Sequence, residues 1–242
     1  MLEKPTFMQN LNQLLFISIA TIPQFENYKK LPSSSQRLWL EKSDNLKSSS
    51  SLSKEHLYRK KAGIYAEFGR IAMIALGIVK DNSLIIRTFE NEDEKKLIKE
   101  LFEIIDKKFN SEALKFCSHN GKEFTYPYIC RRSLSNDLEL PKCLMLNQYK
   151  SWNHPHFDTL DGWKFGDYKG YTSIHALANA LGIPVKFVLK ENETIGDVYY
   201  VHKDMNKISD HLANDISLCA QTFLKMNKLP LIDEKNIDYA KR

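Results

Sequence analysis

Residues 114–134 read LKFCSHNGKEFTYPYICRRSL, and this stretch decides the fold. Its first five residues form a short, mostly apolar run, which is typical of a buried strand. A polar turn around Asn120 and Gly121 follows. Residues 124–134 then predict a helix, because Pro127 would lie in its first turn, where proline is tolerated. A strand that leads through a turn into a helix favours a mixed α/β domain.

Segments on both sides of this stretch extend the pattern. Residues 71–79 are nearly all apolar, as in a strand covered on both faces, and the turn signal at residues 81–83 predicts a hairpin. The clearest helix is expected at residues 92–109, with Asn91 as its cap and Glu94 as the reciprocal partner. The prediction is an α/β fold, a mixed five-stranded sheet flanked by helices, with strands at residues 14–19, 71–79, 84–89, 114–118 and 157–160 and helices at residues 35–42, 54–61, 92–109, 124–134, 172–181 and 204–227.

The composition of the 242 residues is that of an ordinary soluble domain, with 43% hydrophobic and 27% charged residues. No apolar run reaches the roughly 18 residues of a membrane span, and no signal peptide begins the chain. We therefore expect a cytoplasmic protein without a membrane partner. The cysteines, none of which forms a C-x-x-C pair, are expected to be reduced and buried: Cys117, Cys130, Cys143 and Cys219.

Charge is concentrated in one part of the chain. Residues 28–70 contain ten Lys or Arg against four Asp or Glu, which gives +6, while the whole chain carries +5. Residues 43–53 hold six serines and predict a flexible loop. Since no boundary separates a second domain, we expect a single domain over residues 1–242, with a basic, Ser-rich insertion at about residues 28–62. The basic stretch suits an anionic partner such as nucleic acid, and a solvated helical surface is the alternative.

Three strings in the chain resemble one known family, in that family's order. They are AGIYAEFGRI at residues 62–71, HNGKEF with the following PYICRR at residues 119–132, and the segment from Asp158 through Trp163 to Ser173. Together they resemble the predicted 3′–5′ exonucleases related to the proofreading domain of family B DNA polymerases, of the DEDDy type. The resemblance implies a ribonuclease H-like fold and cleavage of nucleotides from a 3′ end.

In that family four carboxylates and a tyrosine surround two divalent ions, which lie about 3.5–4 Å apart beside the scissile phosphodiester. The corresponding positions in this chain are largely replaced. Ser18 and Ala20 stand where the family has Asp-x-Glu, Thr125 stands where it has Asp, and His211 takes the place of the tyrosine. Only the last acid, Asp215, is kept.

One carboxylate brings about one negative charge to ions that together carry four positive charges. We therefore expect no resident cofactor and at best weak metal binding at Asp215, with Mg²⁺ or Mn²⁺ required if any activity remains. The functional prediction is an inactive relative of the exonucleases, kept as a nucleic-acid-binding or protein-interaction module. The alternative is an active exonuclease on single-stranded DNA with a one-metal or histidine-assisted site, in which His211 acts as the base.

Other polar and aromatic residues are further candidates for a site. Glu123 and Asp158 are expected to have local structural roles, and an alternating His154-x-His156-x-Asp158 metal site is the less favoured interpretation. Aromatic residues of the basic stretch could stack on bases or simply pack the insertion onto the body; they are Trp39, Tyr58, Tyr65 and Phe68. The residues expected to contact a single strand are Asn120, Lys122, Phe124, Arg131, Lys164 and Arg70.

Overall fold

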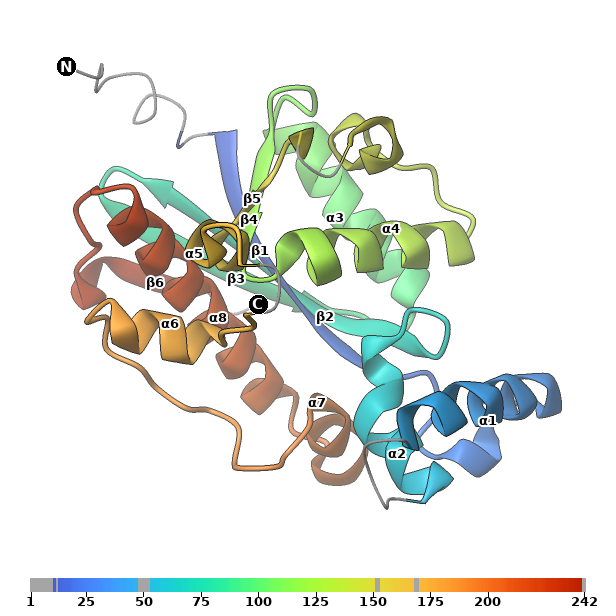
Figure 1. Cartoon of the computed structure of the whole chain (residues 1–242). Coiled ribbons are helices and arrows are strands. Elements are labelled where there is room, and N and C mark those ends of the chain that lie inside the picture. Colours follow the sequence, from blue (N-terminus) through green and yellow to red (C-terminus); the bar gives the residue numbers. More distant parts are fainter. Residues whose placement is uncertain (1–10, 12, 48–52, 151–152, 168–169, 241–242) are drawn as a thin grey trace.

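A six-stranded mixed sheet forms the centre of the protein, in the order β5-β4-β1-β2-β3-β6 (Figure 1). The computed structural model describes residue 11 and residues 13–47, 53–150, 153–167 and 170–240. Strands β1, β2 and β3 form an antiparallel meander, and β4, β5 and β6 add to it in parallel. The strands span Leu14–Pro23 (β1), Gly69–Lys80 (β2), Ser83–Glu90 (β3), Lys115–Ser118 (β4), Phe157–Asp158 (β5) and Ile237–Ala240 (β6).

Helices cover both faces of this sheet (Figure 1). They span Ser33–Lys47 (α1), Lys54–Lys61 (α2), Glu94–Lys108 (α3), Tyr126–Ser135 (α4), Thr159–Lys164 (α5), Ile174–Ala180 (α6), Ile195–Asp197 (α7) and Met205–Met226 (α8). Two π-helical turns, Gly121–Thr125 and Val198–His202, precede α4 and α8.

Alternation along β1 separates two apolar cores. Leu14, Phe16 and Ala20 belong to the core on the α8 side, whereas Leu15 and Ile17 belong to the core beneath α3 and α4. Burying both faces of a strand explains why its sequence is apolar almost throughout. The α/β prediction is confirmed, with one strand more than expected. The additional strand, β6, is only four residues long and lies at the sheet edge, where its sequence, IDYA, carries little strand signal.

The predicted cap of α3 was wrong by two residues. Asp93 is the N-cap, and its carboxylate accepts hydrogen bonds from the backbone N–H groups of Lys95 and Lys96. Glu94 is instead buried, where it accepts a hydrogen bond from the N–H of Ile71 and pairs with the Arg132 guanidinium at 2.6 Å. This ion pair joins α3, β2 and α4, so the acid serves the core rather than the helix end.

The inserted segment carries a small apolar core of its own. Trp39 and Tyr58 are fully buried and pack edge-to-face, with their ring centroids 5.3 Å apart, and Phe68 is 9% exposed. The aromatic residues of the basic stretch thus pack the insertion, and of the four only Tyr65 is half-buried. Residues 43–47 of the predicted loop are helical, since α1 continues through them. Residues 48–52 of that loop lie outside the described residues.

Two basic residues of the insertion fasten it to the body. Arg59 and Lys60 pair with the buried Asp197 carboxylate at 2.6 and 2.9 Å. Asp197 also accepts hydrogen bonds from the N–H and hydroxyl of Thr194. These hydrogen bonds and ion pairs outweigh the cost of burial and hold the pKa of Asp197 well below its ordinary value. Part of the basic charge in this segment therefore has a structural use.

The cysteine prediction is confirmed in its main point. All four cysteines are free, with Cys117, Cys143 and Cys219 buried and Cys130 half-buried. Within the part of the chain that the structure describes, no helix is both long and apolar enough to cross a bilayer.

Replacing Asp197 with alanine is expected to loosen the insertion. Because Arg59 and Lys60 remain partly exposed, the loss in free energy of unfolding should be about 1–3 kcal/mol at pH 7. The depressed pKa means that this stabilisation is present above about pH 4 and disappears as the pH falls below it. Denaturant unfolding measures the loss, and limited proteolysis should show faster cleavage within residues 28–62. The control is Glu41→Ala, which removes the exposed pair with Arg37 and should cost less than about 0.5 kcal/mol.

Candidate functional site

A pocket of about 290 Å³ lies between the middle of β1, the end of β4, the turn Gly121–Thr125, α6 and α8. Ser18, Thr125, His211 and Asp215 all line it. The sheet and helix α8 thus bring together residues that are almost 200 positions apart in the sequence, Ser18 and Asp215. The remaining lining residues are Ile17, Ile19, Ser118, His119, Asn120, Phe124, Tyr171, Ser173, Ile174, His175, Ile216 and Cys219.

The two β1 positions that the resemblance aligns with acids, Ser18 and Ala20, differ in their surroundings. Ser18 is partly accessible and faces the pocket. Ala20 is 1% exposed and belongs to the apolar core on the α8 side, together with Met73 and Ala213. It is not among the residues that line the pocket. A carboxylate at position 20 would therefore enter apolar surroundings, at a cost in desolvation.

The turn that presents Asn120 and Thr125 is held by Asp158. The Asp158 carboxylate accepts hydrogen bonds from the backbone N–H groups of Asn120 at 2.9 Å and Lys122 at 3.0 Å, and it also caps α5. Asn120 has φ of +57°, a left-handed conformation that asparagine tolerates better than most residues. The Thr125 hydroxyl hydrogen-bonds that of Ser118 at 3.0 Å. The expected structural role of Asp158 is thus seen directly, and its oxygens are occupied by backbone groups.

His211 and Asp215 lie one turn apart on α8. His211 Nε2 is 3.6 Å from Asp215 Oδ2. Burial lowers the pKa of His211 to about 4 and raises the pKa of Asp215 to about 7, because each loses water around its charged form. Near pH 7 the imidazole is therefore neutral and the carboxyl is only partly ionised.

Several polar atoms of the pocket residues are left without partners. Asn120 Oδ1, His211 Nδ1 and Asp215 Oδ1 are shielded from water, and no hydrogen-bond partner is found for them among the described residues. An unsatisfied buried polar atom costs about 1–3 kcal/mol, so well-packed cores rarely contain three together. Their concentration here indicates a site rather than ordinary interior packing.

The charge of the pocket is low for a metal centre. Asp215 is the single carboxylate among the described lining residues, whose other side-chain oxygen donors are hydroxyls and an amide. Among the described residues, no group of three or more His, Cys, Asp or Glu side chains is arranged to hold a metal ion. Mg²⁺ and Mn²⁺ prefer charged oxygen ligands, and an ion pair held beside a phosphate needs several of them. These donors match such a pair poorly.

The His154-x-His156-x-Asp158 alternative is not supported by the geometry. His156 is buried, with its Nδ1 accepting from the N–H of Phe116 and its Nε2 donating to the carbonyl of Cys143. Its ring is therefore used on both sides, and burial lowers its pKa to about 3. His154 stacks on the ring of Tyr126.

The six residues expected to contact a strand lie in different places. Asn120 and Phe124 line the pocket. Lys122 pairs with Asp161 at 2.6 Å, and Lys164 pairs with the exposed Glu123 at 3.1 Å, so that two ion pairs join the turn to α5. Arg131 is exposed on α4, and Arg70 donates to the Tyr199 hydroxyl at 2.9 Å. Neither arginine is among the lining residues.

Sequence reasoning missed the wall of the pocket formed by residues 171–175. Tyr171 is 70% exposed and His175 stacks face-to-face on Phe187. Tyr171 and Ser173 belong to the third string of the resemblance, which by itself gives them no role in a pocket. The signal that could have located this wall is the position of residues 171–173 immediately before α6. This helix contacts α8, which carries His211 and Asp215.

Comparisons with known proteins identify the fold and the family. The fold is that of the exonuclease domain of family B DNA polymerases, which is ribonuclease H-like. The chain is similar to the structure of the family B DNA polymerase from the hyperthermophilic archaeon Pyrobaculum calidifontis, with a TM-score of 0.55 and 10% identity. The match covers 88% of this chain and 24% of that one, so the chain spans only a part of the polymerase. No curated protein sequence matched.

A match to a family model shows to which protein family the chain belongs. Residues 64–235 match the model described as a predicted 3′–5′ exonuclease related to the exonuclease domain of PolB. Since the match extends over well more than half of the sequence, the chain belongs to this family. The matched region contains Thr125, His211 and Asp215, whereas Ser18 and Ala20 on β1 precede it.

The raised pKa of Asp215 predicts a pH-dependent effect of Asp215→Asn. Between about pH 4 and pH 7 the folded protein keeps a proton on this carboxyl that the unfolded chain has released, so stability falls as the pH rises through this range. The variant lacks this loss. Its stability relative to the unmodified protein should increase by on the order of 2 kcal/mol from pH 4.5 to pH 8.

Denaturant unfolding at the two pH values measures this change. The control is Asp233→Asn, an exposed position that should give the same difference at both. A difference for Asp215→Asn that does not vary with pH would contradict the neutral-carboxyl account.

Proposed function

We propose that this protein is a nucleic-acid-binding module of the exonuclease family that does not carry out two-metal hydrolysis. The observation that carries the proposal is the pocket itself. Positions at which the family has three acids and a tyrosine are Ser18, Ala20, Thr125 and His211, and Asp215 is the one carboxylate on the lining. The exonuclease scaffold supports strand binding, while the donor set opposes a preorganised pair of ions.

Low charge at the site has a consequence for its stability without metal. Clustered carboxylates repel one another when no cation is present, and functional sites commonly lose stability for that reason. Here the hydroxyl pair of Ser118 and Thr125 takes the place of one such acid. The site can therefore keep its shape without an ion, as a binding function requires.

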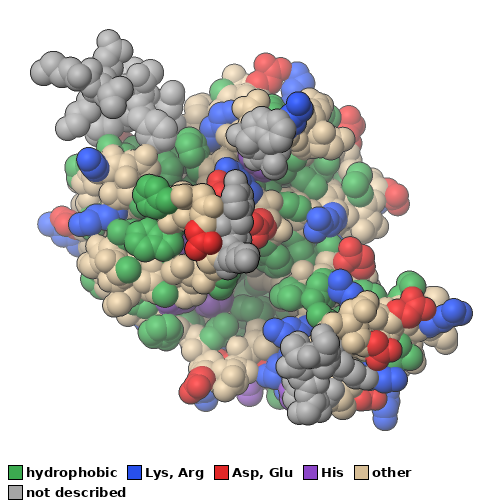
Figure 2. All heavy atoms as spheres, in the orientation of Figure 1, with side chains coloured by type: hydrophobic (Ala, Val, Ile, Leu, Met, Phe, Trp, Pro, Cys, Tyr) green, Lys and Arg blue, Asp and Glu red, His purple; other side chains and the backbone are tan. Residues whose placement is uncertain are grey.

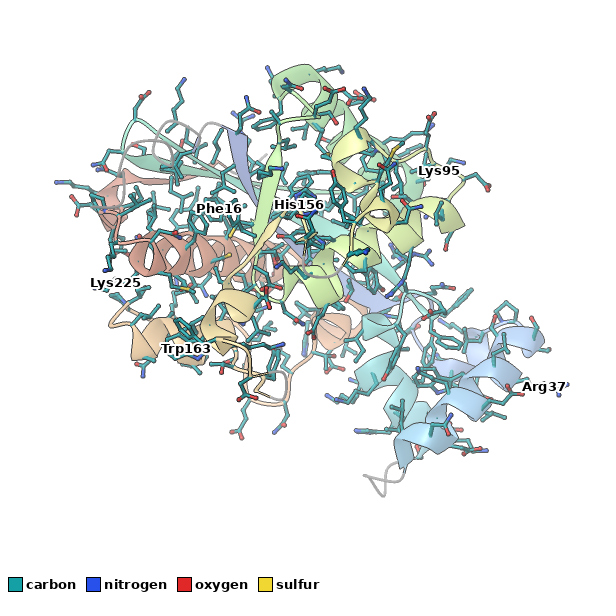
Figure 3. All side chains as sticks on the ribbon, turned by 45° about the horizontal axis from the view of Figure 1, so that its top comes forward. Phe16, Arg37, Lys95, His156, Trp163 and Lys225 are labelled. Carbon is teal, nitrogen blue, oxygen red and sulfur yellow. The ribbon has the colours of Figure 1, made fainter. Side chains whose placement is uncertain are left out.

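Basic groups for a strand are present outside the pocket. Figure 2 shows Lys and Arg side chains over the insertion, interspersed with Asp and Glu. Arg37 projects from α1 with 84% of its side chain exposed (Figure 3), and Arg131 is exposed on α4. Contacts of this kind follow the phosphate backbone and are independent of sequence.

The absence of two-metal hydrolysis is tested by a nuclease assay. The unmodified protein should release no nucleotides from a labelled single strand of DNA or RNA in Mg²⁺ or Mn²⁺. A variant with Ser18→Asp, Ala20→Glu and Thr125→Asp restores the family's acids and is the matched comparison. It should bind divalent ions and, in chelator, melt at a lower temperature than the unmodified protein, because the added carboxylates repel one another and the one at position 20 loses water in apolar surroundings.

Metal-dependent cleavage by the unmodified protein that is lost in Asp215→Asn would instead establish the one-metal or histidine-assisted exonuclease. Loss of that cleavage in His211→Gln would assign the histidine as its base.

Strand binding is tested by the salt dependence of affinity for a labelled single strand. Phosphate contacts predict an affinity that falls about tenfold between 50 and 200 mM salt. Arg131→Ala should weaken binding and make the slope shallower, whereas Lys225→Ala, at an exposed position near the end of α8, should change neither. No affinity at low salt, together with a stable protein partner, would replace the proposal with a purely protein-binding scaffold.

A further inference from the structure

Among the described residues, the lining of the pocket contains neither lysine nor arginine. Of its three histidines, His119 is engaged through both ring nitrogens, by the Thr159 hydroxyl and the carbonyl of Thr172. A phosphate group entering the pocket would meet the Asp215 carboxyl and no lysine or arginine of the described lining. In the two-metal members of such a family the ions themselves attract the phosphate. Without them, no lysine or arginine of the described lining is in place to attract a phosphate.

Aromatic groups provide a different kind of recognition. Tyr171 stands at the mouth, 70% exposed although it lines the pocket. His175 forms the adjoining wall, and its ring lies parallel to that of Phe187 at 4.8 Å between centroids and 11° between planes. Phe124 contributes from the turn that precedes α4, where it also packs against Tyr128. Planar faces of this kind suit the stacking of a heterocycle.

Size and polarity agree with one planar group. A volume of about 290 Å³ is at the lower end for ligand pockets, which hold roughly 300–1,000 Å³, so it suits a nucleoside rather than a length of strand. The polar part of the lining consists mainly of hydroxyl, amide and imidazole groups, which recognise an uncharged partner through hydrogen bonds. The unpartnered atoms of Asn120, His211 and Asp215 lie in this part of the molecule.

We propose that the pocket binds the base of a nucleoside or of a terminal nucleotide, in the place where related exonucleases hold metal-bound phosphate. If the base belongs to the terminal nucleotide of a strand, this proposal rests on the proposed function. If it belongs to a free nucleoside, the proposal is independent of strand binding. Tyr171 and His175 are the stacking surface, and the neutral polar lining contacts the base edges. Recognition then depends on the base and is independent of divalent metal.

The first experiment uses the full chain with small ligands, observed by ligand-detected NMR, which reports weak binding. Adenosine and cytidine should bind at least as well as their 5′-monophosphates, in chelator and in Mg²⁺ alike, while ribose 5-phosphate and inorganic phosphate should not bind. Tyr171→Leu keeps an apolar side chain but removes the ring, and it should weaken nucleoside binding about fivefold or more. The matched control is Tyr149→Leu, 44% exposed and outside this pocket, which should leave binding unchanged.

The second experiment distinguishes the two sources of the base. Single strands ending in a normal nucleotide or in an abasic residue, at either the 3′ or the 5′ end, are compared for affinity. The terminal-nucleotide form predicts that an abasic residue at one of the two ends weakens binding. It also predicts that, in Tyr171→Leu, strands with a normal and an abasic end bind equally well. Nucleoside binding without strand binding supports the pocket and contradicts the proposed function.

Other outcomes overturn the proposal. Strand binding that is equal for normal and abasic ends, with no nucleoside bound, would overturn the base pocket and leave the proposed function standing. Tighter binding of ribose 5-phosphate than of nucleosides, or nucleoside binding that requires Mg²⁺, would assign the pocket to phosphate. Because Tyr171 is exposed, the Tyr171→Leu variant should have the same melting temperature as the unmodified protein. The His175→Leu variant tests the same wall of the pocket a second time.

Discussion

Two divalent cations held side by side require several negative charges from the protein, and this requirement governs the interpretation of the site. Coulomb repulsion between the ions must be offset by carboxylates that are already in place. Here one carboxyl remains on the lining, and its burial favours the protonated form. The same scaffold that could position a phosphodiester for hydrolysis is thereby left with a small, nearly neutral pocket.

The scaffold around that pocket does not need the ions for its own integrity. Asp158 ties the turn before α4 to α5 through backbone hydrogen bonds, and the Glu94–Arg132 pair ties α3 to α4. α8 is anchored by an apolar face whose residues are buried: Ile208, Leu212, Ile216, Ala220, Phe223 and Leu224. Because these interactions lie outside the pocket lining, apart from Ile216 and the backbone N–H of Asn120, the fold does not depend on acidic side chains in the pocket.

Much of the architecture could be predicted from sequence because it depends on local patterns. The apolar runs of β1 and β2 and the spacing of α3 and α8 are each visible within a few turns of chain. The cap of α3 was misplaced because a buried partner, Arg132, determines where Glu94 points, and that partner is 38 residues away. β6 was missed for a similar reason, since its pairing with β3 rather than its own composition makes it a strand. Of the positions that the resemblance singled out, Ser18, Thr125, His211 and Asp215 line one pocket. The depth of Ala20 and the wall of Tyr171 and His175 depend on three-dimensional packing and could not be predicted.

The most direct test is a crystal of the unmodified protein soaked in Mn²⁺, with anomalous scattering used to locate the ions. A protein whose pocket cannot assemble paired cations should show no pair of manganese peaks beside Asp215, and at most one weak peak. Two well-occupied ions a few ångströms apart, both coordinated by Asp215, would contradict the account and would support an active two-metal exonuclease.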